Sequence, residues 1–219
     1  MTVVPFRSPE DVAAAVGAVG AHLAAGGLLA YPTETVYGLG SRPVEEDVRR
    51  LARLKGRRAD KPFLLLVPDR RTAADYGLVF TDAAHALADR FWPGPLTLVL
   101  SGGEGRLPPL LRGPEGGIAV RWTSHPGVAA LLAGIGTGLT STSANRPGGR
   151  TAPGIGAILK DFADGVADGT LLVLDGGVLG NVPPSTIVDC TRPTERPRVI
   201  REGAIPVAEL RAAAGTLAP

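Results

Sequence analysis

Residues 28–40 read LLAYPTETVYGLG, and this stretch indicates how the chain folds. The apolar run 28–31 is typical of a buried strand, and Pro32 marks the point where that strand ends. The next five positions hold four side chains that a plain turn does not need, namely Thr33, Glu34, Thr35 and Tyr37. We therefore expect a site at the end of this strand, with the backbone turning sharply behind it at Gly38 and Gly40.

Composition limits the class of protein. The chain has 219 residues, of which 44% are hydrophobic, so it is long and apolar enough for one large domain with a sizeable core. A net charge of +2 excludes a strongly basic surface of the kind that binds nucleic acid along its whole extent. The single cysteine, Cys190, excludes an internal disulfide and suits a reducing compartment. With no signal peptide and no apolar run of about 20 residues, we expect a soluble, cytoplasmic protein without a membrane span.

Helical and strand patterns alternate along the chain without a break in composition. Caps and helical spacing predict helices over 9–25, 44–56, 81–91, 128–133, 155–162 and 206–214. Apolar runs predict strands over 28–31, 62–68, 96–100, 118–122, from 139 onward, 171–174, 186–190 and 199–200. The pattern predicts a single α/β domain over 1–219 with a mixed, mostly buried sheet. Residues 101–117 are expected to be an irregular loop, and whether it is a flap over a site or an exposed connection stays open.

Polar clusters beside the predicted strands are candidates for a site, because ligands of α/β sheets bind beyond strand ends. These clusters are PTETVYG at 32–38, RWTSHP at 121–126, STSAN at 141–145 and PPST at 183–186. A basic cluster at 55–61, KGRRADK, holds two of the three lysines of the chain. STSAN alone is typical of a turn that caps a helix. Together with KGRRADK it predicts a pocket for phosphate and hydroxyl groups, because Arg and Lys neutralise phosphate while Ser and Asn orient it.

Several familiar kinds of site are excluded. The chain has no GxxxxGK[ST] motif and no GxGxxG after its first strand. Its three histidines and one cysteine lie too far apart for a metal site, so we expect none, and no GxSxG motif supports a covalent serine mechanism. Arg121 ends an apolar strand, where a charge needs a partner. That partner is either an internal carboxylate or the carboxylate of a ligand, and both remain open.

Six motifs in order, YPTETVYGLG, KGR with a following KP, PGPLT, AVRW, STSAN and PSTIVD, resemble the YrdC/Sua5 family. These are the threonylcarbamoyl-AMP synthases of tRNA modification. The resemblance runs from about residue 8 to about residue 205, which we take as the domain core, and the length resembles the single-domain YrdC form. It implies a twisted mixed sheet flanked by helices, with a concave basic cleft.

The resemblance also implies the reaction. The enzyme would be a nucleotidyltransferase that converts L-threonine, bicarbonate and ATP, with Mg²⁺ bridging the phosphates, to threonylcarbamoyl-AMP and pyrophosphate. A threonylcarbamoyl transferase complex would then modify adenosine 37 of tRNA, and direct tRNA or RNA contact stays open.

Site residues carry over from the matching motifs. The catalytic set would be Lys55, Arg57, Ser143 and Asn145. ATP would contact those four residues and also Lys61, Thr151 and Arg201. The L-threonine pocket would be lined by Thr33, Thr35, Arg121, Ser141 and Ser185. This chain departs from some relatives by having Leu66 in a strand where they carry a histidine. Glu34 receives no role, and Tyr37 is expected to pack while offering its hydroxyl to the pocket.

Three alternatives use the same residues differently. A double-stranded RNA-binding or ribosome-associated module would use KGRRADK, bind with a steep salt dependence and turn over no ATP. A carbamoyl-transfer domain of hydrogenase maturation shares the fold, but it usually sits in long chains with zinc-finger and acylphosphatase-like parts that are absent here. The last alternative is a structural protein whose motifs are ordinary turns, and the occurrence of six family motifs in the same order makes it improbable.

Overall fold

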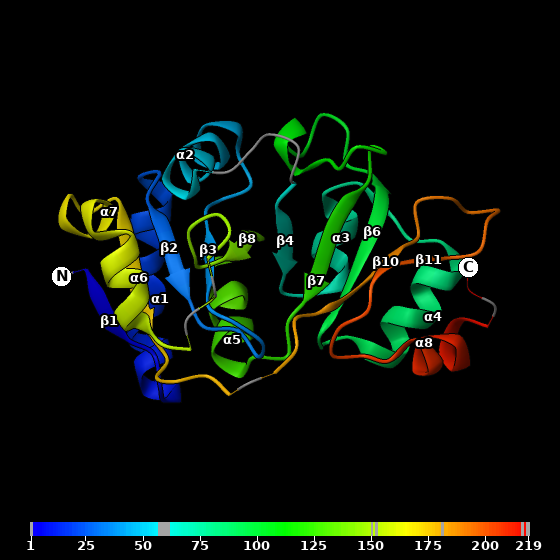
Figure 1. Cartoon of the computed structure of the whole chain (residues 1–219). Coiled ribbons are helices and arrows are strands. Elements are labelled where there is room, and N and C mark those ends of the chain that lie inside the picture. The colour runs from blue at the N-terminus through cyan, green and yellow to red at the C-terminus, as the bar shows by residue number, and fades with distance from the viewer. Residues whose placement is uncertain are drawn as a thin grey trace.

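A mixed sheet runs through the molecule, with the N-terminal strand at one edge and the C-terminal strand at the other (Figure 1). The computed structural model describes residues 2–56, 62–149, 151, 153–180, 182–215 and 217. Its strands are β1 (Val3–Pro5), β2 (Leu28–Tyr31), β3 (Gly38–Gly40), β4 (Leu64–Val67), β5 (Leu78–Val79), β6 (Leu96–Gly102), β7 (Ile118–Trp122), β8 (Leu139–Ser143), β9 (Leu171–Asp175), β10 (Thr186–Asp189) and β11 (Arg198–Arg201).

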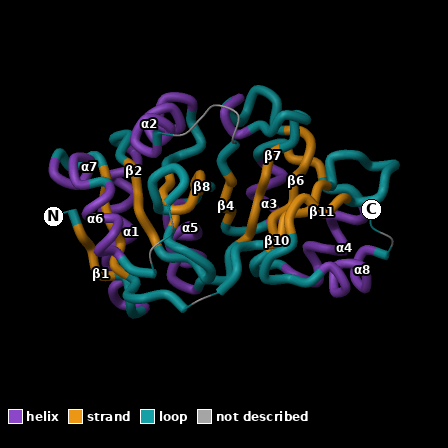
Figure 2. The backbone as a smooth tube through the Cα atoms, in the orientation of Figure 1, coloured by secondary structure: helices purple, strands orange, loops and turns teal. Residues whose placement is uncertain are grey.

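The strand order within these residues is β1-β9-β2-β3-β8-β4-β7-β6-β10-β11, and β5 pairs with β6 beside this path. Parallel and antiparallel pairs both occur, since β2 is parallel to β9 but antiparallel to β3. The predicted α/β fold with a mixed sheet is confirmed. Strands β8 and β4 pair in the middle of the sheet, and we call this junction the seam. Residues 176–180, which follow β9, and residues 182–185, which precede β10, lie along the molecule between the two sides of the seam (Figure 2).

Six helices of the described structure lie close to the ranges that the sequence predicts, whereas three were not predicted. The six are α1 (Pro9–Ala24), α2 (Glu45–Lys55), α4 (Asp82–Phe91), α5 (Pro126–Ile135), α6 (Ile155–Asp161) and α8 (Val207–Ala214). The other three are α3 (Arg70–Asp75), the 3₁₀ helix η1 (Pro109–Leu111) and α7 (Ala163–Ala167). Ser8 caps α1 by accepting a hydrogen bond from the Asp11 amide, and Thr81 caps α4 in the same way. Gly56 ends α2 in the left-handed conformation at φ 62°. No helix in the described ranges has the length and apolar character that crossing a bilayer requires.

Helices cover both faces of the sheet, as the alternating side chains of β2 show. Leu29 and Tyr31 belong to an apolar cluster that includes side chains of α1 and α5. Leu28 and Ala30 belong to the other cluster, which includes side chains of α2 and α6. Because successive residues of a strand point to opposite faces, this division explains why all four residues of β2 are buried.

The expected turn at Gly38 and Gly40 is wrong, because these residues form strand β3 between β2 and β8. The chain reverses earlier, over 32–37. Glycine is needed in β3 because of close packing: a Cβ atom at Gly40 would lie 2.2 Å from the carbonyl oxygen of Thr140. Strand neighbours on both sides therefore leave no room for a side chain at this position.

Residues 101–117 are more ordered than an irregular loop. Their first part extends β6, and η1 follows with Leu111 fully buried. Arg112 holds the segment together by donating to the carbonyl oxygens of Gly102 and Gly116, each at 3.0 Å. Residues 113–117 then approach the cavity described below. The segment is therefore a packed wall in this structure.

Candidate active site

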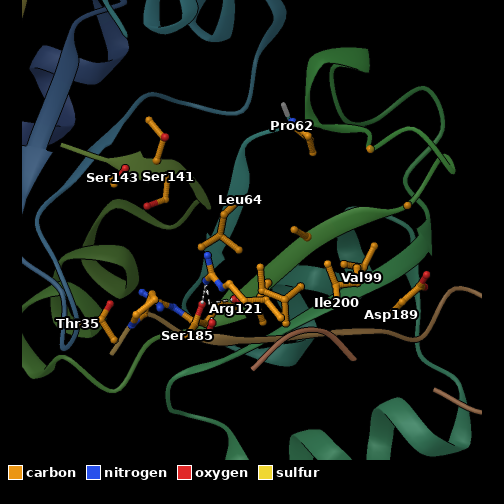
Figure 3. A pocket seen from close by; sticks show the side chains of 18 of the residues that line it. Thr35, Pro62, Leu64, Val99, Arg121, Ser141, Ser143, Ser185, Asp189 and Ile200 are labelled. Atoms are coloured by element: carbon orange, nitrogen blue, oxygen red, sulfur yellow. Dashed lines mark hydrogen bonds between the residues drawn. The ribbon is translucent and has the colours of Figure 1, made fainter. Parts of the chain in front are cut away.

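A cavity of about 790 Å³ opens along the seam, on the side where the 32–37 turn and the ends of β7 and β8 meet. Thr35, Ser141 and Ser143 lie on one side of Arg121, and Val99, Ile200 and Asp189 lie on the other (Figure 3). The cavity thus has a hydroxyl-rich end and an apolar end with Arg121 between them. Its size falls within the range of small-molecule sites.

Thr33 shapes the hydroxyl-rich end by closing the 32–37 turn. Its hydroxyl donates to the Val36 carbonyl oxygen at 2.7 Å and accepts from the Thr35 amide at 3.2 Å. The hydroxyl oxygens of Thr33 and Thr35 lie 3.1 Å apart, and both residues are buried and line the cavity. The two threonines therefore replace the Gly, Asn or Asp of an ordinary turn with a local side-chain network.

Tyr37 uses its hydroxyl away from the cavity, so the expectation that it serves the pocket is wrong. The hydroxyl donates to the Gly177 carbonyl oxygen at 2.8 Å and accepts from the Gly176 amide at 3.0 Å. Burial raises the pKa of this hydroxyl above its ordinary value, which keeps it protonated as a donor. Tyr37 consequently fixes the segment that leaves β9.

Arg121 is the central cation of the cavity. Only 3% of the residue is exposed, and its Nη2 atom lies 3.8 Å from a carboxylate oxygen of Glu34. Its Nε atom is buried without a hydrogen-bond partner among the described residues. The structure therefore gives Arg121 a loose internal ion pair and leaves donors available toward the cavity.

Arg201 and the remaining hydroxyls lie beside it. Arg201 donates to the Ser185 carbonyl oxygen at 2.7 Å, and the Ser185 hydroxyl lies 2.9 Å from that of Thr97. The pKa of Arg201 is lowered by burial and, to a smaller extent, by the positive charge of Arg121. Ser141, on β8, is 7% exposed and lines the same end. Two neighbouring guanidinium groups favour an anionic ligand.

Lys55 lies behind the cavity wall. It is 4% exposed, and its ammonium group donates to the Ser143 carbonyl oxygen at 2.6 Å, to Asn145 Oδ1 at 3.1 Å and to the Asn145 carbonyl oxygen. The Ser143 hydroxyl also donates to Asn145 Oδ1, at 2.5 Å. Of these three residues only Ser143 lines the cavity. Lys55 and Asn145 thus shape the turn that presents Ser143.

Thr151 and Leu66, which the sequence also singled out, do not line the cavity. Thr151 is half-buried. Arg57 and Lys61 lie outside the described residues. On β4, Leu64 lines the cavity, whereas Leu66 is fully buried in the cluster that packs on α1 and α5. The lining residue of this strand is therefore two positions before the leucine that we singled out.

Sequence reasoning missed the apolar end of the cavity. Its wall is formed by side chains of β6, β7, β10 and β11, namely Val99, Ala119, Ile187 and Ile200. At the rim, Arg198 donates to Glu115 at 2.8 Å and to Asp189 at 3.1 Å. Burial alone would raise the pKa of Asp189, but hydrogen bonds from Thr191 and the charge of Arg198 outweigh it and lower that pKa. Every second residue of a strand faces the same side of the sheet, so these residues could have been grouped from the sequence only if the order of the strands had been known.

Ionisable side chains in the described ranges offer no cluster of three histidine, cysteine or acidic residues that could hold a metal ion. The carboxylates near the cavity are already paired, Glu34 with Arg121 and both Glu115 and Asp189 with Arg198. Their geometry fits internal ion pairs better than metal ligands.

Two relatives of this chain bear the name threonylcarbamoyl-AMP synthase. The enzyme of that name from Thiobacillus denitrificans is 39% identical over 170 residues, which cover 77% of this chain and 87% of the relative. That from Chromobacterium violaceum is 38% identical over 177 residues, covering 80% and 86%.

Solved structures agree with this similarity. P. abyssi Sua5 in complex with L-threonine matches with a TM-score of 0.86 at 29% identity, covering 99% of this chain and 62% of that chain. This chain therefore spans about three fifths of P. abyssi Sua5. E. coli YciO matches with a TM-score of 0.76 at 26% identity, covering 94% and 96%. The family model Sua5_yciO_yrdC, described as "Telomere recombination", matches residues 21–203. The chain belongs to the Sua5/YciO/YrdC family.

Proposed function

We propose that this chain is a threonylcarbamoyl-AMP synthase, a nucleotidyltransferase that converts L-threonine, bicarbonate and ATP to threonylcarbamoyl-AMP and pyrophosphate. The observation that carries the proposal is the buried Arg121 beside a hydroxyl-rich end of the cavity, in a chain whose relatives bear that name. This reaction would be the first step of N6-threonylcarbamoyladenosine formation at position 37 of tRNA, in the cytoplasm. One domain over 1–219, with its core at about 8–205, would carry the whole reaction.

The hydroxyl-rich end suits an amino acid. A guanidinium group binds a carboxylate through two parallel hydrogen bonds, and Arg121 has donors available for this. The hydroxyls around it both donate and accept, which suits the ammonium and hydroxyl groups of L-threonine. These residues are Thr33, Thr35, Ser141 and Ser185.

ATP would take the rest of the cavity. The apolar wall of β6, β7, β10 and β11 offers a surface for a flat ring. In our proposal the phosphates lie near Ser143 and Arg201, which line the cavity. The resemblance to the family adds further ATP contacts to this proposal, at Lys55, Arg57, Lys61, Asn145 and Thr151. Mg²⁺ would arrive on the triphosphate and offset its charge, because it is usually bound through substrate phosphates and few protein ligands.

The chemistry needs no protein nucleophile. The threonine nitrogen attacks bicarbonate and, with loss of water, forms a carbamate. A carbamate oxygen then attacks the α-phosphorus, and pyrophosphate leaves. The chain would contribute positioning and positive charge, which are the main sources of rate in phosphoryl-type transfers. The carbamate and the α-phosphate are both anionic, and the Arg121 and Arg201 guanidinium groups would lower their mutual repulsion.

The RNA-binding alternative gains no support from the described part of α2. Arg49 pairs with Glu45 at 2.8 Å, and Arg50 lies 3.8 Å from Glu46. These arginines are therefore partly neutralised by their own helix, which weakens a phosphate-binding surface. We propose that the product passes to a tRNA-modifying threonylcarbamoyl transferase complex and that this chain itself needs no extended RNA contact.

Pyrophosphate release tests the proposal. We expect release from Mg-ATP and bicarbonate that depends on L-threonine, together with a product of threonylcarbamoyl-AMP mass. ATP consumption that ignores threonine would assign another acceptor to the cavity. No turnover, combined with salt-sensitive RNA binding, would overturn the enzyme and favour the RNA-binding module.

A further inference from the structure

Glu34 stands in the 32–37 turn and has no part in the reaction proposed above. Its side chain is 17% exposed, and its carboxylate points toward β7 and the residues that follow it. Thr123, which is fully buried, donates its hydroxyl to Glu34 Oε2 at 2.5 Å. The Thr123 hydroxyl in turn accepts from the His125 amide at 3.2 Å. A chain of hydrogen bonds therefore fixes the direction of the Glu34 carboxylate.

The same carboxylate oxygen lies 3.8 Å from Nη2 of Arg121. That separation is longer than a hydrogen bond but short enough for strong attraction away from bulk water. Glu34 therefore balances the guanidinium charge without occupying its N–H groups. Among the described residues, no other carboxylate lies within ion-pair distance of Arg121.

Arg201 repels Arg121, whereas Glu34 attracts it. The two positive charges interact, since Arg121 contributes to the lowered pKa of Arg201. Arg201 forms no ion pair with a carboxylate of the described residues, and its own hydrogen bonds go to Ser185. Glu34 is thus the carboxylate, among the described residues, whose attraction offsets this repulsion at Arg121.

We propose that Glu34 is the positioning residue for Arg121: held by Thr123, it fixes the guanidinium at the cavity wall with its hydrogen-bond donors directed at the ligand carboxylate. The inference rests on the proposed function, because it takes L-threonine as that ligand. The Arg121–Glu34 pair is neutral as a unit, so Arg201 supplies the net positive charge at this end of the cavity.

Calorimetric titration with L-threonine tests the inference on the full chain. Glu34→Gln removes the charge but keeps an oxygen for Thr123, and Thr123→Val removes the hydroxyl that orients Glu34. Arg121→Lys and the double variant E34Q/R121K complete a double-mutant cycle. Asp47→Asn is the matched control, because Asp47 is a 2% exposed carboxylate that pairs with Arg42 at 2.7 Å and does not line the cavity.

We expect Glu34→Gln to weaken L-threonine binding about tenfold, because the ligand must then order Arg121 itself. Thr123→Val should act in the same direction by a smaller factor. E34Q/R121K should bind no more weakly than R121K, since the effect of Glu34 passes through Arg121. Asp47→Asn should lower the melting temperature and leave threonine affinity within about twofold.

Other outcomes overturn the inference in distinguishable ways. Unchanged threonine affinity in a folded Glu34→Gln variant removes Glu34 as a positioning residue and leaves the proposed function intact. Additive losses in the double variant show that Glu34 does not act through Arg121. If Glu34→Gln does not fold, an unchanged affinity in Thr123→Val excludes the positioning role in its place. Absence of L-threonine binding by the unmodified protein overturns the proposed function itself.

Discussion

The Lys55 ammonium nitrogen lies 2.6 Å from the carbonyl oxygen of Ser143, so the last residue of α2 is tied to the last residue of β8. Asn145 supplies two more acceptors to the same ammonium group. A lysine has three N–H donors, and three acceptors of one turn surround them. Lys55 is therefore a structural part of the SxN turn in this structure, whatever contact it makes with phosphate during the reaction.

Lys55→Ala should accordingly lower both stability and activity. The substitution leaves buried acceptors of the turn without their donor, and each such group costs about 1–3 kcal/mol. We expect the free energy of unfolding to fall by about 3 kcal/mol, measured by urea denaturation. Lys160→Ala is the control, because Lys160 is exposed on α6 and should change stability by less than about 0.5 kcal/mol. Equal stability of the two variants would remove the structural role of Lys55.

Arg121→Ala should weaken L-threonine selectively. Losing a buried charged hydrogen-bond donor costs about 1.5–3 kcal/mol, so the KM for threonine should rise about tenfold to a hundredfold. Arg121→Lys should recover little, because an ammonium group lacks the planar fork that binds a carboxylate. The control is Arg192→Ala, whose side chain is 61% exposed and pairs with Glu195 at the surface. An unchanged threonine KM in Arg121→Ala would exclude Arg121 from the threonine site.

His125 makes the stability of the protein dependent on pH. Its Nδ1 atom accepts from the Val128 amide at 3.2 Å and so caps α5 in the neutral form. Burial lowers the pKa of His125 below its ordinary 6.5, and the nearby Glu34 carboxylate only partly offsets this. The folded-state pKa lies below the unfolded one, so this contribution is present above pH 6.5 and is lost as pH falls through the lower folded value.

His125→Asn tests that dependence, because asparagine also caps helices but does not titrate. We expect the variant to lose less stability than the unmodified protein between about pH 7.5 and about pH 5. Chemical denaturation at a series of pH values measures the difference. Parallel curves for the two proteins would show that His125 does not titrate across this interval.

Two glycines should respond to alanine in opposite ways. At Gly40 a Cβ atom would meet the Thr140 carbonyl oxygen at 2.2 Å, so Gly40→Ala must separate β3 from β8. We expect a loss of about 2 kcal/mol or more. Gly17 lies in α1, and apart from its own helix backbone no atom lies within 4 Å of the place that a Cβ atom would take, so Gly17→Ala should stabilise the protein by about 0.5–1 kcal/mol. Thermal or urea denaturation compares the pair, and destabilisation by Gly17→Ala would contradict this interpretation of α1.

Local chemistry made most elements predictable from the sequence. Ser8 and Thr81 cap their helices with the side chains that the sequence shows, and Gly56 ends α2 by adopting a conformation that glycine favours. Strand β3 was not predictable in this way, because glycine is depleted in strands and Gly40 is there to let Thr140 approach. That reason comes from a strand about a hundred residues further along the chain.

The site was predictable only in part, for the same reason. Thr33, Thr35 and Arg121 stand at strand ends, where polar side chains attract notice. Val99 and Ile187 look like ordinary core residues in the sequence, and only the order of β6 and β10 turns them into a cavity wall. Glu34 and Thr123 are 89 residues apart, so no local sequence pattern could predict their hydrogen bond. Arg57 and Lys61 lie outside the described residues, and their phosphate contacts stay predictions.

The strand order also determines when the site comes into being. Its hydroxyl-rich end draws on the 32–37 turn and on β8, while Ser185 and Arg201 come from the last quarter of the chain. During synthesis, a chain that has emerged only as far as β9 has Thr33 and Arg121 but lacks one wall of the cavity. Completion of β10 and β11 then supplies the missing wall at once. The cavity is therefore complete only after the last two strands of the chain have joined the sheet.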